Sequence, residues 1–200
     1  QEAKWNPEYR TDILDKYVRL TRPHWDSDLV VWPETAVPVF YDRVQDNFLA
    51  ALAYEARPHH TDMVLGIPAR DVESRRYYNA VMTLGSPRGF YYKRHLVPFG
   101  EYVPLRNLFN NLLDVLHAPM SDFTPGSSDQ DTLRAAGYPL GAAICYEIAF
   151  GGEVISTLPK AAYLVTVSNN TWFGDSSAPH QILEMAQMRA RETGRYVLSA

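Results

Sequence analysis

Short apolar runs alternate with amphipathic stretches along this chain. Apolar residues recur at helical spacing in three stretches, after the helix-start pair Asn6-Pro7, over 40–52 and over 179–193. Apolar runs of strand length lie at 28–32, 63–67, 77–84, 90–93, 140–146 and 163–168. Gly, Ser and Pro residues between the third and fourth of these runs predict a hairpin. Because strands alternate with helices, the pattern predicts an α/β fold with some antiparallel pairing.

Composition and charge narrow the class of protein. The chain has 200 residues, of which 46% are hydrophobic and 21% charged, as in folded globular proteins. No repeat or low-complexity tract divides it, so we treat residues 1–200 as one domain. The net charge of −4 offers no basic surface for a nucleic-acid backbone, and we expect no nucleic-acid partner. No run approaches the roughly 18 consecutive apolar residues of a membrane-spanning helix.

The two ends of the sequence indicate a segment of a longer protein. The chain begins at Gln1 with neither an initiator Met nor a signal-peptide pattern. It ends in the strand-like run 195–200 without a turn or polar tail after it. We therefore expect an internal segment, with more of the protein after Ala200.

Three residues with reactive side chains fall at the C-terminal ends of predicted strands, where the loops of α/β folds shape their pockets. Glu34 follows the first run, Lys93 closes the fourth, and Cys145, the only cysteine, lies in the fifth. Each residue also has a purely structural interpretation. Taken alone, Cys145 fits a small buried residue, Glu34 a carboxylate at a helix N-terminus, and Lys93 a solvated basic turn.

Together, the three side chains form a workable site for acyl transfer. A thiol is a weak nucleophile at neutral pH until a base removes its proton or a cation stabilises its thiolate. Glu34 can act as that base, because a buried carboxylate is a stronger base than one in water. Lys93 can stabilise the thiolate and also the oxyanion of a tetrahedral intermediate, together with the backbone N–H that follows Cys145.

Motifs around these residues resemble those of a known superfamily. The segments 31–36, 92–101 and 145–147 are similar to the three motifs of the nitrilase superfamily, whose members use a Glu, Lys, Cys triad in this chain order. Within that superfamily the apolipoprotein N-acyltransferase family is the best match. This finer resemblance lies in the longer segments 95–104, 143–148 and 168–174.

The resemblance implies a nitrilase-like αββα sandwich, here the truncated extramembrane catalytic domain of a membrane protein, incomplete at its C-terminal end. It implies an enzyme of the bacterial inner membrane whose domain faces the periplasm and which acylates lipoproteins during their maturation. A membrane phospholipid would donate an acyl chain, which passes through a Cys thioester to the α-amine of a diacylglyceryl apolipoprotein. No cofactor is implied. The six His residues have no metal-ligand spacing, so we expect no metal.

Carried over residue by residue, the resemblance assigns roles within the site. Glu34 would be the general base, Lys93 the oxyanion stabiliser and Cys145 the nucleophile. The positions expected to support the site or bind substrate are Trp5, Asn79, Glu101, Tyr146 and Glu147. For Glu101 and Glu147, a purely structural role in ion pairs is the alternative.

Two rival functions use the same fold. A soluble nitrilase-type amidase would hydrolyse small amides with the same triad, because water would replace the amine as acceptor. A catalytically silent binding domain has no physical need for all three side chains, so their presence argues against it.

An apolar helix face predicted over 105–116 either packs on the core or guides acyl chains at the mouth of the pocket.

Overall fold

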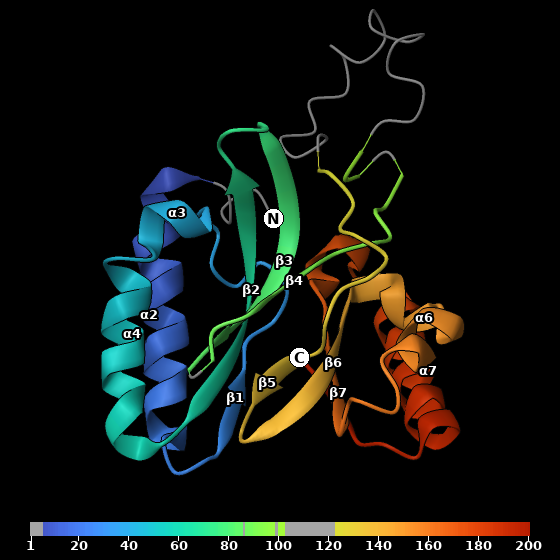
Figure 1. The fold of residues 1–200 in the computed structure, drawn as a ribbon. Helices are drawn as coiled ribbons and strands as arrows, with labels where there is room; N and C mark the ends of the chain where they lie inside the picture. Colours follow the sequence, from blue (N-terminus) through green and yellow to red (C-terminus); the bar gives the residue numbers. More distant parts are fainter. Residues whose placement is uncertain (1–5, 86, 99, 103–122) are drawn as a thin grey trace, which may run out of the picture.

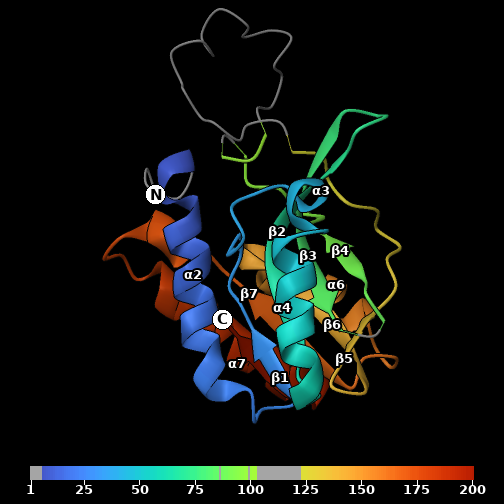
Figure 2. The same ribbon diagram turned by 90° about the vertical axis from the view of Figure 1, so that its left-hand side faces the viewer.

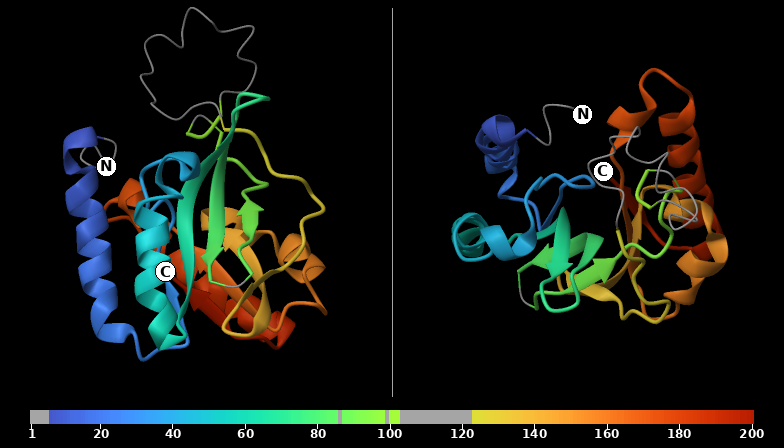
Figure 3. Two further views of the ribbon diagram at one scale, coloured as in Figure 1. Left: turned by 60° about the vertical axis from the view of Figure 1, so that its left-hand side comes forward. Right: turned by 90° about the horizontal axis from the view of Figure 1, so that it is seen from above.

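Two sheets face each other in this structure, and helices cover the outer face of each (Figures 1 and 2). The computed structural model describes residues 6–85, 87–98, 100–102 and 123–200. Seen from above, the layers follow one another as helices, sheet, sheet and helices (Figure 3). The predicted α/β class and the αββα order of layers are therefore confirmed.

The first sheet has the strand order β1-β2-β3-β4. Its strands are β1 (Leu29–Val31), β2 (Asp62–Asp71), β3 (Arg76–Leu84) and β4 (Phe90–Tyr92). β1 pairs with β2 in parallel, whereas β2, β3 and β4 pair antiparallel, which confirms the predicted hairpin. The strands predicted at 28–32 and 63–67 are also confirmed, although β1 is a half-buried edge strand where the apolar run indicated a buried one.

Helices on the outer face of the first sheet are α2 (Arg10–Thr21), α3 (Tyr41–Val44) and α4 (Phe48–Ala56), with 3-10 turns η1 (Pro7–Tyr9), η2 (Arg22–His24) and η3 (Arg57–His59) beside them. The predicted helix start is confirmed, because Asn6 Oδ1 accepts the backbone N–H of Glu8 at 3.0 Å. The prediction of one helix over 40–52 is wrong. Asn47 Oδ1 accepts the N–H of Phe48 at 2.5 Å and so caps a second, separate helix.

The second sheet has the order β5-β6-β7-β8. Its strands are β5 (Leu133–Ala135), β6 (Tyr138–Ile144), β7 (Tyr163–Val167) and β8 (Val197–Ser199), and its helices are η5 (Cys145–Ala149), α6 (Gly151–Ser156), η6 (Asn170–Phe173) and α7 (Ala178–Thr193). β6, β7 and β8 are parallel, and β5 pairs antiparallel with β6. The strand predicted over 140–146 ends earlier than expected, because Cys145 begins a 3-10 helix. β5 and α6 were not predicted.

Alternation of side chains along the strands divides the core into layers. On β2, Met63 and Leu65 pack against the helices of the first sheet, while Val64 packs between the two sheets. There it belongs to the same apolar cluster as Ile144 and Val165 of the second sheet. Cys145 lies in this cluster as well. The interior between the sheets therefore reaches the end of β6, where the expected nucleophile lies.

Several expectations stay untested by the described residues. Trp5 and the helix predicted over 105–116 lie outside them. Within the described ranges, no helix is both long and apolar enough to cross a membrane. The continuation of the protein beyond Ala200 stays a prediction.

Gly66 allows β2 to pass directly against the segment that follows β1. A Cβ here would lie 2.3 Å from the carbonyl oxygen of Pro33 and 2.6 Å from the Cα of Glu34. Since backbone must then move, we expect Gly66→Ala to lower the free energy of unfolding by about 1–3 kcal/mol, measured by urea denaturation. Gly152→Ala, where a Cβ meets nothing within 4 Å on α6, is the control and should leave stability unchanged or slightly raised. Equal midpoints for both variants would contradict this packing.

Candidate active site

The loop after β1 delivers Glu34 to the interior. Trp32 is buried among the helices, and its Nε1 donates to Thr21 Oγ1 at 2.8 Å, which anchors the end of the strand. Pro33 then ends the sheet pairing. Thr35 has a φ of 53°, a left-handed conformation that turns the chain sharply. Between these fixed residues, Glu34 is only 7% exposed.

The carboxylate of Glu34 is bound on both oxygens. Oε1 accepts a hydrogen bond from Asn79 Nδ2 at 2.7 Å and lies 3.4 Å from Lys93 Nζ. Oε2 accepts the backbone N–H of Asn169 at 2.9 Å. Asn79 comes from β3 of the first sheet, whereas Asn169 follows β7 of the second. Glu34 is therefore held by both sheets.

Lys93 follows β4 and carries the buried cation of the site, with 1% of the residue exposed. Its Nζ lies 2.9 Å from Glu101 Oε2, and its backbone N–H donates to the carbonyl of Asn79 at 2.8 Å. Burial alone would lower the pKa of Lys93, but the charges of Glu34 and Glu101 raise it above its ordinary value. The ammonium therefore stays charged at neutral pH.

Asn79 connects the two carboxylates around that cation. Its Nδ2 donates to Glu34 Oε1 and to Glu101 Oε1, each at 2.7 Å. Glu101 also accepts the backbone N–H of Val97 at 2.8 Å. The sequence left open whether Glu101 has a structural role, and its contacts fix the ammonium of Lys93 within the loop.

Cys145 occupies a strained turn between β6 and η5. Its φ is 57°, which is uncommon for a residue with a side chain, and it is 6% exposed. Burial and the charge of Glu34 raise the pKa of the Cys145 thiol to about 12, against the opposing effects of Lys93 and of a hydrogen bond from the Tyr146 backbone. The thiol is therefore protonated at neutral pH, and a base must remove its proton before it can react.

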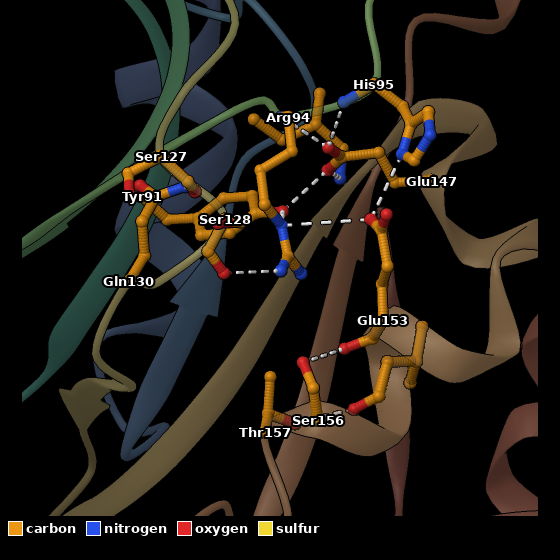
Figure 4. Close-up of polar contacts among 12 residues, drawn as sticks. Tyr91, Arg94, His95, Ser127, Ser128, Gln130, Glu147, Glu153, Ser156 and Thr157 are labelled. Atoms are coloured by element: carbon orange, nitrogen blue, oxygen red, sulfur yellow. Dashed lines mark hydrogen bonds and ion pairs between the residues drawn. The ribbon is translucent and has the colours of Figure 1, made fainter.

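Glu147 joins the loop of Lys93 to the turn of Cys145. Figure 4 shows it beside Arg94 and His95. Its Oε1 accepts the backbone N–H groups of Arg94 at 2.6 Å and His95 at 3.0 Å, just after Lys93. Its Oε2 accepts the N–H of Ile144 at 2.8 Å, just before Cys145. Glu147 is 2% exposed, and burial raises its pKa even though these hydrogen bonds oppose the shift.

Tyr146, the residue after Cys145, lies beside Lys93. Its hydroxyl donates to the carbonyl of Leu96 at 3.0 Å, and its ring centroid lies 5.7 Å from Lys93 Nζ. At this distance the face of the ring attracts the ammonium. Tyr146 thus ties the segment after Cys145 to the segment after Lys93.

One cavity of about 180 Å³ collects the reactive groups. It is lined by Glu34, Asn79, Lys93, Glu101 and Cys145, together with apolar side chains that include Val97, Phe123 and Phe173. The structure therefore brings together five of the residues expected from sequence. Tyr146 and Glu147 do not line the cavity but contact the segments that follow Lys93. Within the part of the chain that the structure describes, no group of three or more His, Cys, Asp and Glu residues could hold a metal ion.

Two contributors to the site were not assigned a role from sequence. One is the backbone N–H of Asn169 on Glu34, and the other is Tyr91, which donates to Glu147. Asn169 lies in the segment 168–174, whose resemblance was the available signal. A backbone donor has no residue-type signal, and neither does a tyrosine inside an apolar strand.

The family model for carbon-nitrogen hydrolases matches residues 1–200. The chain belongs to the carbon-nitrogen hydrolase family. Solved members share the fold at low sequence identity. A carbon-nitrogen hydrolase from Helicobacter pylori G27 has a TM-score of 0.68 and 16% identity, covering 95% of this chain and 68% of that one. Saccharomyces cerevisiae Nit3 of the nitrilase superfamily has a TM-score of 0.62 and 18% identity, covering 97% and 71%.

Relatives at higher identity within this family share one name. A Methylococcus capsulatus protein named apolipoprotein N-acyltransferase is 55% identical over 200 residues. A Nitrosomonas europaea protein of the same name is 45% identical over 201 residues. Each alignment covers 100% of this chain but 40% of the relative. The chain therefore spans less than half the length of these relatives.

The substitution Glu34→Gln removes the charge of this side chain and keeps its size, so it tests how that charge affects Cys145. Since the charge of Glu34 raises the pKa of Cys145, we expect Glu34→Gln to lower that pKa below the wild-type value of about 12. The pH dependence of iodoacetamide alkylation of Cys145, followed by mass spectrometry, measures the shift. Glu55→Gln, which removes a carboxylate paired with Arg22 at 2.7 Å outside the cavity, should leave the profile unchanged. A pKa that stays or rises in Glu34→Gln would be evidence against direct coupling of the two groups.

Proposed function

We propose that this chain is the catalytic domain of an N-acyltransferase that moves an acyl chain from a membrane phospholipid to the α-amine of a lipid-modified N-terminal Cys on an apolipoprotein. One observation carries the proposal: a buried Glu, Lys and Cys line one cavity in a chain 55% identical to a protein of that name. Residues 1–200 would form a nitrilase-like domain, incomplete at its C-terminal end. The whole protein would lie in the bacterial inner membrane, with this domain facing the periplasm.

In the first half-reaction, Glu34 takes the proton of the Cys145 thiol, and Sγ attacks the ester carbonyl carbon of the phospholipid. Negative charge develops on the carbonyl oxygen, where the Lys93 ammonium and the backbone N–H of Tyr146 stabilise it. The carbon–oxygen bond then breaks, and Glu34 returns its proton to the departing lysophospholipid oxygen. A thioester on Cys145 remains.

In the second half-reaction, the free α-amine of the apolipoprotein attacks the thioester carbonyl. Glu34 accepts a proton from the amine, the carbon–sulfur bond breaks, and the proton returns to the Cys145 sulfur. The products are an amide and the free thiol. The thioester is the more reactive acyl group and the amide the more stable one, so the reaction runs toward acylated lipoprotein.

The supporting residues act by positioning Glu34, Lys93 and Cys145. Asn79 and Glu101 hold the Lys93 ammonium beside Glu34, and their short contacts support that role. Glu147 and Tyr146 keep the segments after Lys93 and Cys145 in register. Trp5 is proposed on the resemblance alone.

The apolar wall of the cavity supports a lipid substrate. Val97, Phe123 and Phe173 line the same space as the thiol. An acyl chain packed against these side chains would exclude water from the thioester, which water would otherwise hydrolyse. A small polar amide offers no such contact, so the wall favours the acyltransferase over a soluble amidase.

The decisive experiment traps the intermediate in the intact protein. In detergent, with a radiolabelled-acyl phospholipid and no acceptor, we expect a hydroxylamine-labile label on the wild-type protein that is absent in Cys145→Ala. Glu34→Gln should label about 10²–10⁴-fold more slowly, because the general base is lost. Glu55→Gln, altered outside the cavity, should label like the wild type.

The outcomes separate the candidate functions. Discharge of the label onto a diacylglyceryl peptide amine, forming an amide, supports the acyltransferase. If the wild-type protein takes up no label but hydrolyses small amides, the acyltransferase proposal is wrong and the amidase function holds. If the protein neither takes up the label nor hydrolyses amides, it is the catalytically silent binding domain.

A further inference from the structure

A buried tyrosine completes the hydrogen bonds of Glu147 (Figure 4). Tyr91 lies on β4 with 4% of its surface exposed, and its hydroxyl donates to Glu147 Oε2 at 3.0 Å. Burial and the charge of Glu147 raise the pKa of Tyr91, so the hydroxyl keeps its proton. Tyr91 is therefore a permanent donor to the carboxylate that connects Lys93 to Cys145.

Arg94 holds the same hydroxyl from its other side. Its Nε donates to the Tyr91 oxygen at 3.1 Å, and its guanidinium carbon lies 5.6 Å from the centre of the Tyr91 ring. The Nη1 atom donates to the carbonyl of Ser128 at 3.1 Å, and Nε lies 3.8 Å from Glu153 Oε2. The Tyr91 hydroxyl is thus fixed between a cation and the Glu147 carboxylate.

We infer that Tyr91, held by Arg94, is a positioning residue that keeps the Glu147 carboxylate oriented so that Lys93 stays beside Cys145. The inference rests on the proposed function for its catalytic readout only. Neither Tyr91 nor the Arg94 side chain lines the cavity that holds the thiol, so both act through Glu147.

The physical reason is the demand of a buried carboxylate for donors. Glu147 Oε2 has two of them, the Tyr91 hydroxyl and the Ile144 N–H. Without the hydroxyl, one oxygen of a buried charge loses half of its hydrogen bonds, which favours rotation or protonation of the carboxylate. Either change releases a backbone N–H beside Lys93 or Cys145. A displacement of about 1 Å between reacting groups is enough to cost 10²-fold in rate.

Tyr91→Phe in the intact protein tests the inference, since it removes one oxygen and keeps the ring beneath Arg94. We expect acyl-thioester formation to slow by about 10- to 100-fold, with the KM for phospholipid within about twofold of wild type. Iodoacetamide alkylation of Cys145 should also slow by about threefold or more, because a displaced Lys93 no longer favours the thiolate.

Tyr163→Phe is the matched control. Its hydroxyl donates to the carbonyl of Ala135 at 3.0 Å, in the same core between the sheets but away from Glu147. Both rates should stay at the wild-type level. Arg94→Gln, which leaves the Tyr91 hydroxyl in place, should lower both rates in the same direction but less than Tyr91→Phe does.

Each outcome decides one question. The inference is wrong if Tyr91→Phe keeps both rates, or if Tyr163→Phe loses as much, since the loss would then follow from removing any buried hydroxyl. If Tyr91→Phe does not fold, unchanged rates in Arg94→Gln would overturn it. A wild-type protein that forms no thioester would overturn the proposed function instead, and the alkylation rates would still test the role of Tyr91.

Discussion

One buried ammonium organises this site. A lysine that is 1% exposed is costly unless opposite charges surround it, and here Glu34 and Glu101 both lie within salt-bridge distance of Nζ. Two carboxylates facing one cation would repel each other, and Asn79 offsets that repulsion by donating to both. The loop after β1, strand β3 and the loop after β4 must therefore meet at one point. The first sheet supplies this meeting point because its central strands are antiparallel neighbours.

The second sheet contributes the thiol and couples it to that charge cluster. Cys145 adopts a left-handed φ at the end of β6. Glu147 accepts the backbone N–H of Arg94, which follows Lys93, and that of Ile144, which precedes Cys145. The raised pKa of Cys145 means that the site holds a protonated thiol at neutral pH. A protonated thiol avoids the side reactions of a free thiolate, and in the proposed mechanism transfer of its proton to Glu34 produces the nucleophile.

Apolar periodicity was a sound guide to the strands, the hairpin and the long helix α7, because each has a repeated pattern over several residues. It failed where a single polar contact decides the outcome, as at Asn47, whose side chain splits one predicted helix into two. It also missed β5, which has only three residues. Reactive residue types at strand ends, together with the family resemblance, indicated Glu34, Lys93 and Cys145. Donors that depend on backbone placement, such as the Asn169 N–H, follow only from the folded chain.

The contact between Glu34 and Asn169 also has a consequence for how the chain folds. These residues are 135 positions apart, and the loop that carries Asn169 belongs to the opposite sheet. Closing so long a loop is a slow, late step of folding, because the chain loses conformational entropy before the long-range contacts form that compensate for it. A partly folded chain with only the first sheet formed holds Glu34 and Lys93 but no thiol beside them. The charge cluster and the thiol therefore meet only at the end of folding, and until then the thiol lacks the burial that raises its pKa in the folded chain.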